Sequence, residues 1–220
     1  MTDAARSGEP GPDPTGEPKV EWLTVAGDAD AWRSIGLTVN ADGLIPLVGT
    51  SIRIVPAAEG ESIGIVGWAL SGARDTADID GLATEVVAPA TPFYADHPLG
   101  ASGLDHVVVS TADLERTSGA IAVATGCELK RIREVGSMRQ GFHRIGRGGL
   151  IVELVERAGL PAGPAAFWGL VLIVDDLDAA YDLLGAERIS APKDAVQPGR
   201  RIATVRAEVG LGLPVALMTH

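Results

Sequence analysis

Residues 104 to 156 constrain the fold more than any other part of the chain. Leu104 to Ser110 is an apolar, β-branched run typical of a buried strand, and a helical pattern follows it, with Thr111 as the expected N-cap and Gly126 as the stop. Three further strands are predicted, at Glu128 to Val135, Arg139 to Ile145 and Leu150 to Glu156. The predicted order is strand, helix, strand, strand, strand.

A looser copy of this unit follows at residues 166 to 219, with a helix capped by Asp175. Asp113-Leu114 and Asp176-Leu177 are 63 residues apart (176 − 113 = 63), and the turns at Gly146 and Gly210 are 64 apart (210 − 146 = 64). Because these two offsets agree within one residue, they indicate that the unit is duplicated. We therefore predict an α+β fold in which paired βαβββ modules, 104–156 and 166–219, form a cupped mixed sheet with flanking helices.

The N-terminal half carries a weaker form of the pattern. Residues 19–90 are expected to form a degenerate, shortened βαβββ region, which includes a strand at Leu37 to Val39 and a helix at Thr76 to Leu82. Residues 91–103 are expected to be a linker, with Phe93, Tyr94 and His97 available to line the mouth of a pocket. Residues 1–18, rich in Gly, Pro and acidic side chains, are predicted to be a disordered tail.

The charge balance limits the classes of partner. A formal net charge of −11 and a pI near 4.7 argue against nucleic acid or an anionic membrane as the main partner, because both require a positive surface. The single cysteine, Cys127, cannot form an internal disulfide, which favours a cytoplasmic location. The sequence also shows neither a secretory signal pattern nor an apolar stretch of about 18 residues that would span a membrane.

Three segments resemble the vicinal oxygen chelate superfamily of glyoxalases, bleomycin-resistance proteins and extradiol dioxygenases, whose paired βαβββ modules form one cupped sheet. They are LDHVVVSTADLERT at 104–117, GLIVELVE at 149–156 and FWGLVLIVDDLDAAYDLLG at 167–185. The resemblance covers residues 104–219 well and 20–87 only weakly. It implies a glyoxalase-like domain at 104–220 with a small-molecule site in the cup, and it is consistent with a homodimer.

The same resemblance implies metal ligands on the first and last strands of each module. His106 and Glu153 match these positions, and both suit a divalent ion. The second module departs from the pattern, because the offsets of 63 and 64 place Gly169 (169 − 106 = 63) and Leu217 (217 − 153 = 64) there. Trp22 and Ile54 fall near the matching positions of the N-terminal region.

A catalytic metal site would therefore need a third ligand, and the candidates are His97, His143, Glu156 and a partner chain. The alternative interpretation is that His106 and Glu153 form a buried hydrogen-bonded pair or bind a polar substrate group directly. In that case either residue would serve as a general base.

The turn lengths predict further residues of the cup. A four-residue hairpin loop at 146–149 places Phe142 opposite Glu153, with Gln140 and Arg144 on the same face. The same count around residues 210–213 places Arg206 opposite Leu217, with Thr204 on that face. Two arginines in the cup would suit a carboxylate or enolate, whereas the alternative is that they pair with Glu153 or lie at the sheet rim.

Two aromatic and two basic residues complete the predicted site region. Trp168 and Phe167 are expected in the core or the pocket wall, and Arg200 and Arg201 in a solvated turn. The leading functional hypothesis is a glyoxalase-like protein that binds a small organic molecule, neutral or anionic, without a tightly held metal. The alternatives are a divalent-metal-dependent lyase, isomerase or dioxygenase that uses His106 and Glu153, and a structural domain with a collapsed cup.

Overall fold

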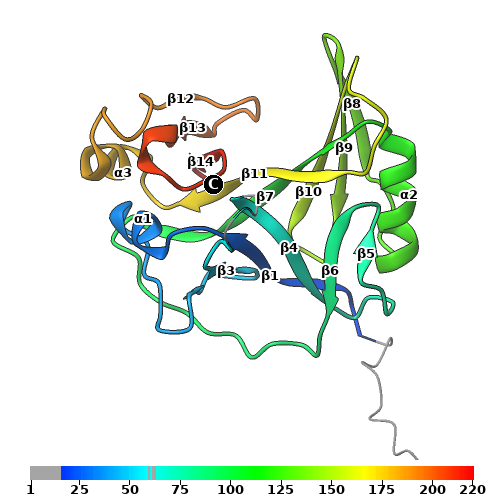
Figure 1. Cartoon of the computed structure of the whole chain (residues 1–220). Coiled ribbons are helices and arrows are strands. Elements are labelled where there is room, and N and C mark those ends of the chain that lie inside the picture. Colours follow the sequence, from blue (N-terminus) through cyan, green and yellow to red (C-terminus); the bar gives the residue numbers. More distant parts are fainter. Residues whose placement is uncertain (1–15, 59, 61–62) are drawn as a thin grey trace, which may run out of the picture.

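The computed structural model describes residues 16–58, 60 and 63–220, so most of the predicted tail at 1–18 lies outside the described residues. These residues form two mixed β-sheets flanked by α-helices, and the sheets lie one against the other (Figure 1). No helix of the described part is long and apolar enough to cross a membrane. The α+β class with paired βαβββ modules is confirmed.

The C-terminal sheet has the strand order β12-β13-β14-β11-β7-β10-β9-β8. Its first module consists of β7 (Ala101–Thr111), α2 (Leu114–Thr125), β8 (Arg131–Val135), β9 (Met138–Arg144) and β10 (Ile151–Arg157). Its second module consists of β11 (Ala166–Val174), α3 (Leu177–Leu184), β12 (Lys193–Asp194), β13 (Arg201–Thr204), the 3₁₀ helix η1 (Ala207–Val209) and β14 (Val215–Met218).

The helix boundaries follow from local capping. Asp113, not Thr111, caps α2, because its carboxylate accepts a hydrogen bond from the Arg116 N–H. Asp176, not Asp175, caps α3 in the same way. Gly126 ends α2 as predicted, and its φ of 71° is a conformation that glycine adopts without strain.

The strand pairing shows how the two modules are related. The central strands β7 and β11 are antiparallel, and each runs parallel to the last strand of its own module, β10 or β14. Val107 pairs with Leu170, which is 63 residues further along (170 − 107 = 63). A local two-fold axis therefore passes between these two residues and relates one module to the other.

The N-terminal sheet repeats this arrangement with fewer elements, in the order β2-β3-β1-β4-β6-β5. β1 and β4 are antiparallel at its centre, and each runs parallel to β3 or β6. The elements are β1 (Lys19–Ala26), α1 (Ala29–Ser34), β2 (Leu44–Ile45), β3 (Ser51–Val55), β4 (Gly64–Ser71), β5 (Asp78–Ile79) and β6 (Leu82–Val86).

Two predicted elements of this half are wrong. Leu37 to Val39 forms no strand, and the expected helix at 76–82 is replaced by the short β5 and a turn. The turn forms because the Asp78 carboxylate accepts a hydrogen bond from the Gly81 N–H and Asp80 adopts a left-handed φ of 54°. Local turn chemistry therefore overrides the weak helical pattern.

The buried faces of the two sheets share one apolar core. Trp68 of β4, 1% exposed, meets Phe167 of β11 edge to face, with 5.4 Å between the ring centroids. Val48 forms a parallel bridge with Gly103, and Asp80 forms an ion pair with Arg116 of α2. The N-terminal region is thus a second sheet on the back of the C-terminal sheet.

Candidate small-molecule site

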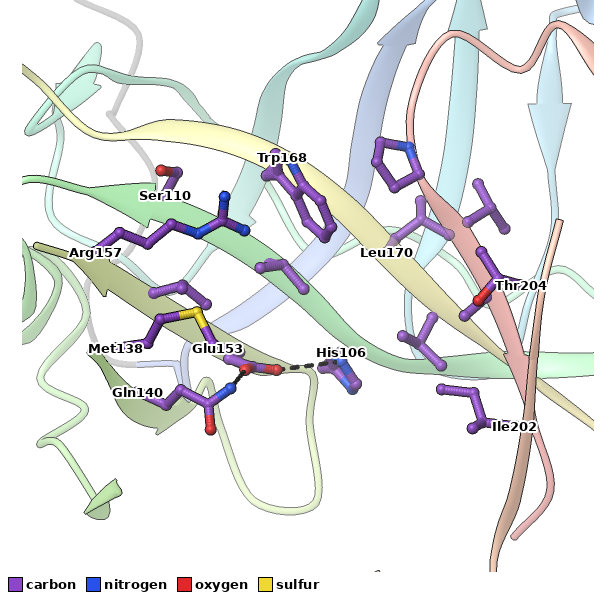
Figure 2. Close-up of a pocket in the computed structure, with 16 residues that line it drawn as sticks. His106, Ser110, Met138, Gln140, Glu153, Arg157, Trp168, Leu170, Ile202 and Thr204 are labelled. Carbon is purple, nitrogen blue, oxygen red and sulfur yellow. Dashed lines mark hydrogen bonds and ion pairs between the residues drawn. The ribbon is translucent and has the colours of Figure 1, made fainter. Parts of the chain in front are cut away.

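The open face of the C-terminal sheet holds a cavity of about 310 Å³ (Figure 2). Its wall is mainly apolar, and all of its lining residues lie between positions 106 and 216, so the N-terminal sheet does not cover it. The polar and charged lining residues are His106, Ser110, Gln140, Glu153, Arg157 and Thr204.

His106 and Glu153 form the polar centre of the cavity. Glu153 pairs with Val108 in the parallel β7–β10 ladder, which makes it a diagonal neighbour of His106 on the same face. His106 Nε2 lies 3.3 Å from Glu153 Oε2, and the Gln140 side-chain amide donates to Glu153 Oε1 at 2.7 Å (Figure 2). Both side chains of the His–Glu pair are only 13% exposed.

A second ion pair, with Asp105, holds His106 through the ring nitrogen that does not face Glu153. Asp105 Oδ2 lies 2.7 Å from His106 Nδ1, and Arg200 Nη2 donates to Asp105 Oδ1 at 2.7 Å. Arg200 Nε also donates to the Thr219 carbonyl at 2.7 Å. The prediction of a solvated turn is therefore wrong for Arg200, which is fixed against the first strand of the site.

The two carboxyl groups beside His106 have opposite pKa shifts. Burial raises the pKa of Asp105, but hydrogen bonds from His106 and Arg200 outweigh burial and lower that pKa to about 2. Burial raises the pKa of Glu153 above its ordinary value, although the charge of His106 opposes the shift. Ionised Asp105 can only accept, so His106 Nδ1 carries a proton, and Nε2 is the nitrogen that faces Glu153.

Arg200 is expected to contribute measurably to stability. Replacing it with methionine leaves a buried carboxylate without its guanidinium partner, so the free energy of unfolding should fall by about 1–2 kcal/mol. Arg201→Met is the matched control, because Arg201 pairs with the exposed Asp178 and should show little change. Urea unfolding of both variants measures the free energy of unfolding. An equal decrease in both would contradict the assigned contribution of the Arg200–Asp105 ion pair.

The effect of Arg200→Met should also depend on pH. The folded pKa of Asp105 lies below its ordinary value of 3.8, so the stabilising contribution is fully present above pH 3.8 and is lost as the pH falls towards about 2. The stability difference between wild type and Arg200→Met should therefore shrink over this range. A difference independent of pH would contradict the ion pair.

Three of the six residues predicted to bind substrate line the cavity. Gln140, Trp168 and Thr204 do so, and Trp168 is 47% exposed at the rim, where the Arg157 guanidinium lies 5.7 Å from its ring centroid. Phe142 pairs with Glu153 as predicted but is not among the lining residues, and the Arg131 guanidinium covers its ring at 4.7 Å.

The two arginines predicted in the cup lie elsewhere. Arg144 is exposed and donates to the Gly149 carbonyl at the end of the hairpin. Arg206 is exposed and donates to the Ala186 carbonyl. Its predicted pairing with Leu217 is wrong, since Leu217 pairs with Ala203. The 3₁₀ helix η1 lengthens the connection between β13 and β14, which a count from the glycine turn did not anticipate.

The second module supplies no metal ligand to the cavity. The two-fold pairing places Gly169 at the position equivalent to His106, as predicted, and a Cβ at Gly169 would lie 2.6 Å from the Pro214 carbonyl oxygen. The equivalent of Glu153 is Ala216 rather than Leu217, because Val171 pairs with Ala216 as Val108 pairs with Glu153. Leu217 is buried in the core.

The proposed additional ligands are also engaged elsewhere. His97 contacts the Thr38 N–H and the Pro46 carbonyl, His143 lies between Ser118 and the Cys127 carbonyl, and Glu156 forms an ion pair with Arg139. Among residues 16–58, 60 and 63–220, no three His, Cys, Asp or Glu side chains are arranged to hold a metal ion. The donor set of these described residues therefore does not fit a three-ligand catalytic metal site.

Asp105, Arg157 and Arg200 are the functional candidates that sequence reasoning missed. The adjacent acidic residue and histidine at positions 105 and 106 were a usable signal, because an acidic group often orients a functional imidazole. Arg200 could not be found in this way, since it is 95 residues from Asp105 in the sequence (200 − 105 = 95).

No protein-family model matches the chain, and no curated protein sequence matches it significantly. Solved structures do match. A triple mutant of 4-hydroxymandelate synthase from Streptomyces coelicolor aligns over 92% of both chains with a TM-score of 0.59 at 13% identity. Methylmalonyl-CoA epimerase from Mycobacterium tuberculosis covers 55% of this chain and 89% of its own, with a TM-score of 0.46 at 18% identity. The match to the synthase, over 92% of the chain at 13% identity, establishes the fold alone: this chain has paired βαβββ modules arranged in two mixed sheets.

Proposed function

We propose that the C-terminal cup binds a small organic molecule and that Glu153 and His106 transfer a proton to or from it without a bound metal ion. One observation carries this proposal. In a mainly apolar cavity, a carboxyl group with a raised pKa faces an imidazole that a buried aspartate and an arginine hold in place. Asp105 and Glu153, on either side of this imidazole, have opposite pKa shifts, an arrangement that is typical of acid–base sites.

The cavity also defines the class of ligand. A volume of about 310 Å³ is at the lower end of the range for small-molecule pockets. The apolar wall suits a compact hydrocarbon or aromatic body, and the His106–Glu153 pair suits one hydroxyl, carbonyl or acidic C–H group. Among the described residues that line the cavity, Arg157 is the cation, so it would bind an anionic substituent at the rim beside Trp168.

Each residue of the site then has a role. Glu153 would accept the proton, because its raised pKa makes its carboxylate a stronger base than an ordinary one. Gln140 fixes the second carboxylate oxygen. His106, when it carries a proton on Nε2 as well as on Nδ1, would stabilise the negative charge that develops on the substrate oxygen, and Asp105 and Arg200 are positioning residues that hold the imidazole.

The two alternative functions receive less support. A metal-dependent lyase, isomerase or dioxygenase needs a third ligand that the described residues do not supply. A collapsed cup is inconsistent with the cavity volume and with a half-exposed Trp168 at its rim.

The test is a ligand-observed NMR screen of compact carbonyl, hydroxyl and carboxyl compounds, run in EDTA. We expect at least one compound to bind wild type and to lose affinity by about tenfold or more with Glu153→Gln, since the site loses a charge-assisted hydrogen bond. Hits that bind only after divalent ions are added would contradict the metal-free site. If the hits bind Glu153→Gln as tightly as wild type, they bind outside the proposed site.

A further inference from the structure

The open face of the N-terminal sheet has a cavity of its own, of about 440 Å³. Strands β1 and β3 contribute Trp22 and Arg53 to its wall. The connection from β6 to β7 passes along this sheet on its way to the C-terminal half and contributes Phe93 and Tyr94 (Figure 1). The cavity lies on the opposite side of the sheet from the shared core and is separate from the site described above.

This cavity is the structural counterpart of the C-terminal cup, with different chemistry. Leu23 and Trp68 occupy the two-fold centre of the N-terminal sheet, as Val107 and Leu170 do in the C-terminal sheet. Trp22 therefore lies where His106 does, as the sequence predicts. Arg53, rather than Ile54, takes the place of Glu153, because it pairs with Thr24 as Glu153 pairs with Val108.

The Arg53 guanidinium is available to bind an anion. It lies 4.0 Å from the centroid of the Trp22 ring, a cation–π arrangement that orients it. Within the described part of the chain no carboxylate forms an ion pair with Arg53. The carboxylate of Glu21, which also lines the cavity, is already bound to Lys19 and to the Ser71 hydroxyl.

A second donor without an acceptor lies beside Arg53. The indole Nε1 of Trp22 is buried and makes no hydrogen bond in the structure. A buried N–H without an acceptor is unfavourable, and this one can meet a ligand oxygen only if the indole ring turns towards the cavity. The Arg53 guanidinium is therefore the donor of this pair that the cavity wall offers to a ligand.

The remaining wall suits an aromatic ring. Phe93 and Tyr94 are 55% and 62% exposed, and Leu44 and Leu47 line the same cavity. Exposed aromatic side chains at a cavity are typical of a ligand-binding surface. Aromatic groups pack on such rings through stacked or edge-to-face contacts.

We propose that the N-terminal cavity binds a planar aromatic carboxylate. The carboxylate pairs with the Arg53 guanidinium, and the ring packs against Phe93 and Tyr94. This second site is independent of the proton-transfer chemistry proposed for the C-terminal cup.

The test is calorimetric titration of the full chain with 2-naphthoate. We expect binding that weakens about tenfold or more with Arg53→Met, since the change removes a charge-assisted hydrogen bond while it retains much of the apolar stem. Arg131→Met is the matched control, because Arg131 lies over Phe142 on the other sheet in a similar arrangement. The neutral 2-naphthamide should bind wild type about tenfold more weakly than the acid.

Several outcomes would overturn the proposal. They are no binding of 2-naphthoate by wild type at millimolar concentration, full binding by Arg53→Met, equal weakening by Arg131→Met, and loss of binding in Trp168→Leu, which would assign the ligand to the other cavity. Thermal unfolding confirms that each variant is folded. If Arg53→Met is unfolded, Arg53→Lys replaces it, and binding should still fall severalfold because lysine lacks the planar bidentate group.

Discussion

Replacing Trp68 with alanine is expected to lower the free energy of unfolding by about 4 kcal/mol, the usual cost of truncating a fully buried tryptophan. Trp68 is 1% exposed, its Nε1 donates to the Thr84 hydroxyl at 2.8 Å, and its ring meets Phe167 of the other sheet. Truncation would leave a cavity between the sheets and a buried hydroxyl without its donor. Urea unfolding followed by circular dichroism measures the change.

Trp168→Ala is the matched control for this prediction. Trp168 lies at the rim of the cup and is 47% exposed, so its loss should cost clearly less. Because both sheets share one core, Trp68→Ala should weaken the whole chain in a single transition. If only the N-terminal half unfolded earlier while the C-terminal half kept its wild-type midpoint, the shared core would be contradicted.

Glu153→Gln is expected to slow proton transfer to a bound ligand by about 100-fold or more, since a positioned acid–base group usually contributes two to four orders of magnitude. The measurement is deuterium incorporation in D₂O, followed by NMR, into those compounds of the screen that carry an acidic C–H group. Glutamine has nearly the shape of glutamate, so the cavity should be preserved.

The control for this variant is Glu156→Gln. Glu156 is on the same strand but pairs with Arg139 away from the cavity, so exchange should continue at the wild-type rate. In wild type the rate should fall as the pH drops through the pKa of Glu153, which burial places above the ordinary value of 4.5. Equal exchange rates in wild type, Glu153→Gln and Glu156→Gln would show that Glu153 takes no part in the proton transfer.

The fold of the C-terminal half was predictable because its signals are local. The order strand, helix, strand, strand, strand matches the structure, and Gly126 ends α2 as expected. A four-residue turn was enough to set Phe142 opposite Glu153. Strand alternation and turn length need no knowledge of distant residues.

The errors arose where distant contacts or irregular backbone decide the structure. The position of Arg200 depends on Asp105, and nothing near Arg200 in the sequence indicates that contact. The 3₁₀ helix η1 shifts the register that would have placed Arg206 in the cup. In the N-terminal sheet, strands of two residues such as β2 and β5 are too short to show a periodicity.

The charge expected in the cup also differs from the structure. Two arginines were expected to face an anionic ligand, but among the described residues that line the cavity the one arginine is Arg157, at the rim. The position that corresponds to Glu153 in the other sheet holds Arg53. The two sheets thus present an acid–base pair on one open face and a cationic, aromatic surface on the other.

The most direct test of the metal-free acid–base site is metal content by mass spectrometry, on untagged protein purified without chelator and after dialysis against divalent ions. We compare wild type with His106→Ala and Glu153→Ala. We expect far less than one metal ion per chain in all three proteins. Near-stoichiometric metal in wild type that is lost in both variants would contradict it, and would make His106 and Glu153 metal ligands.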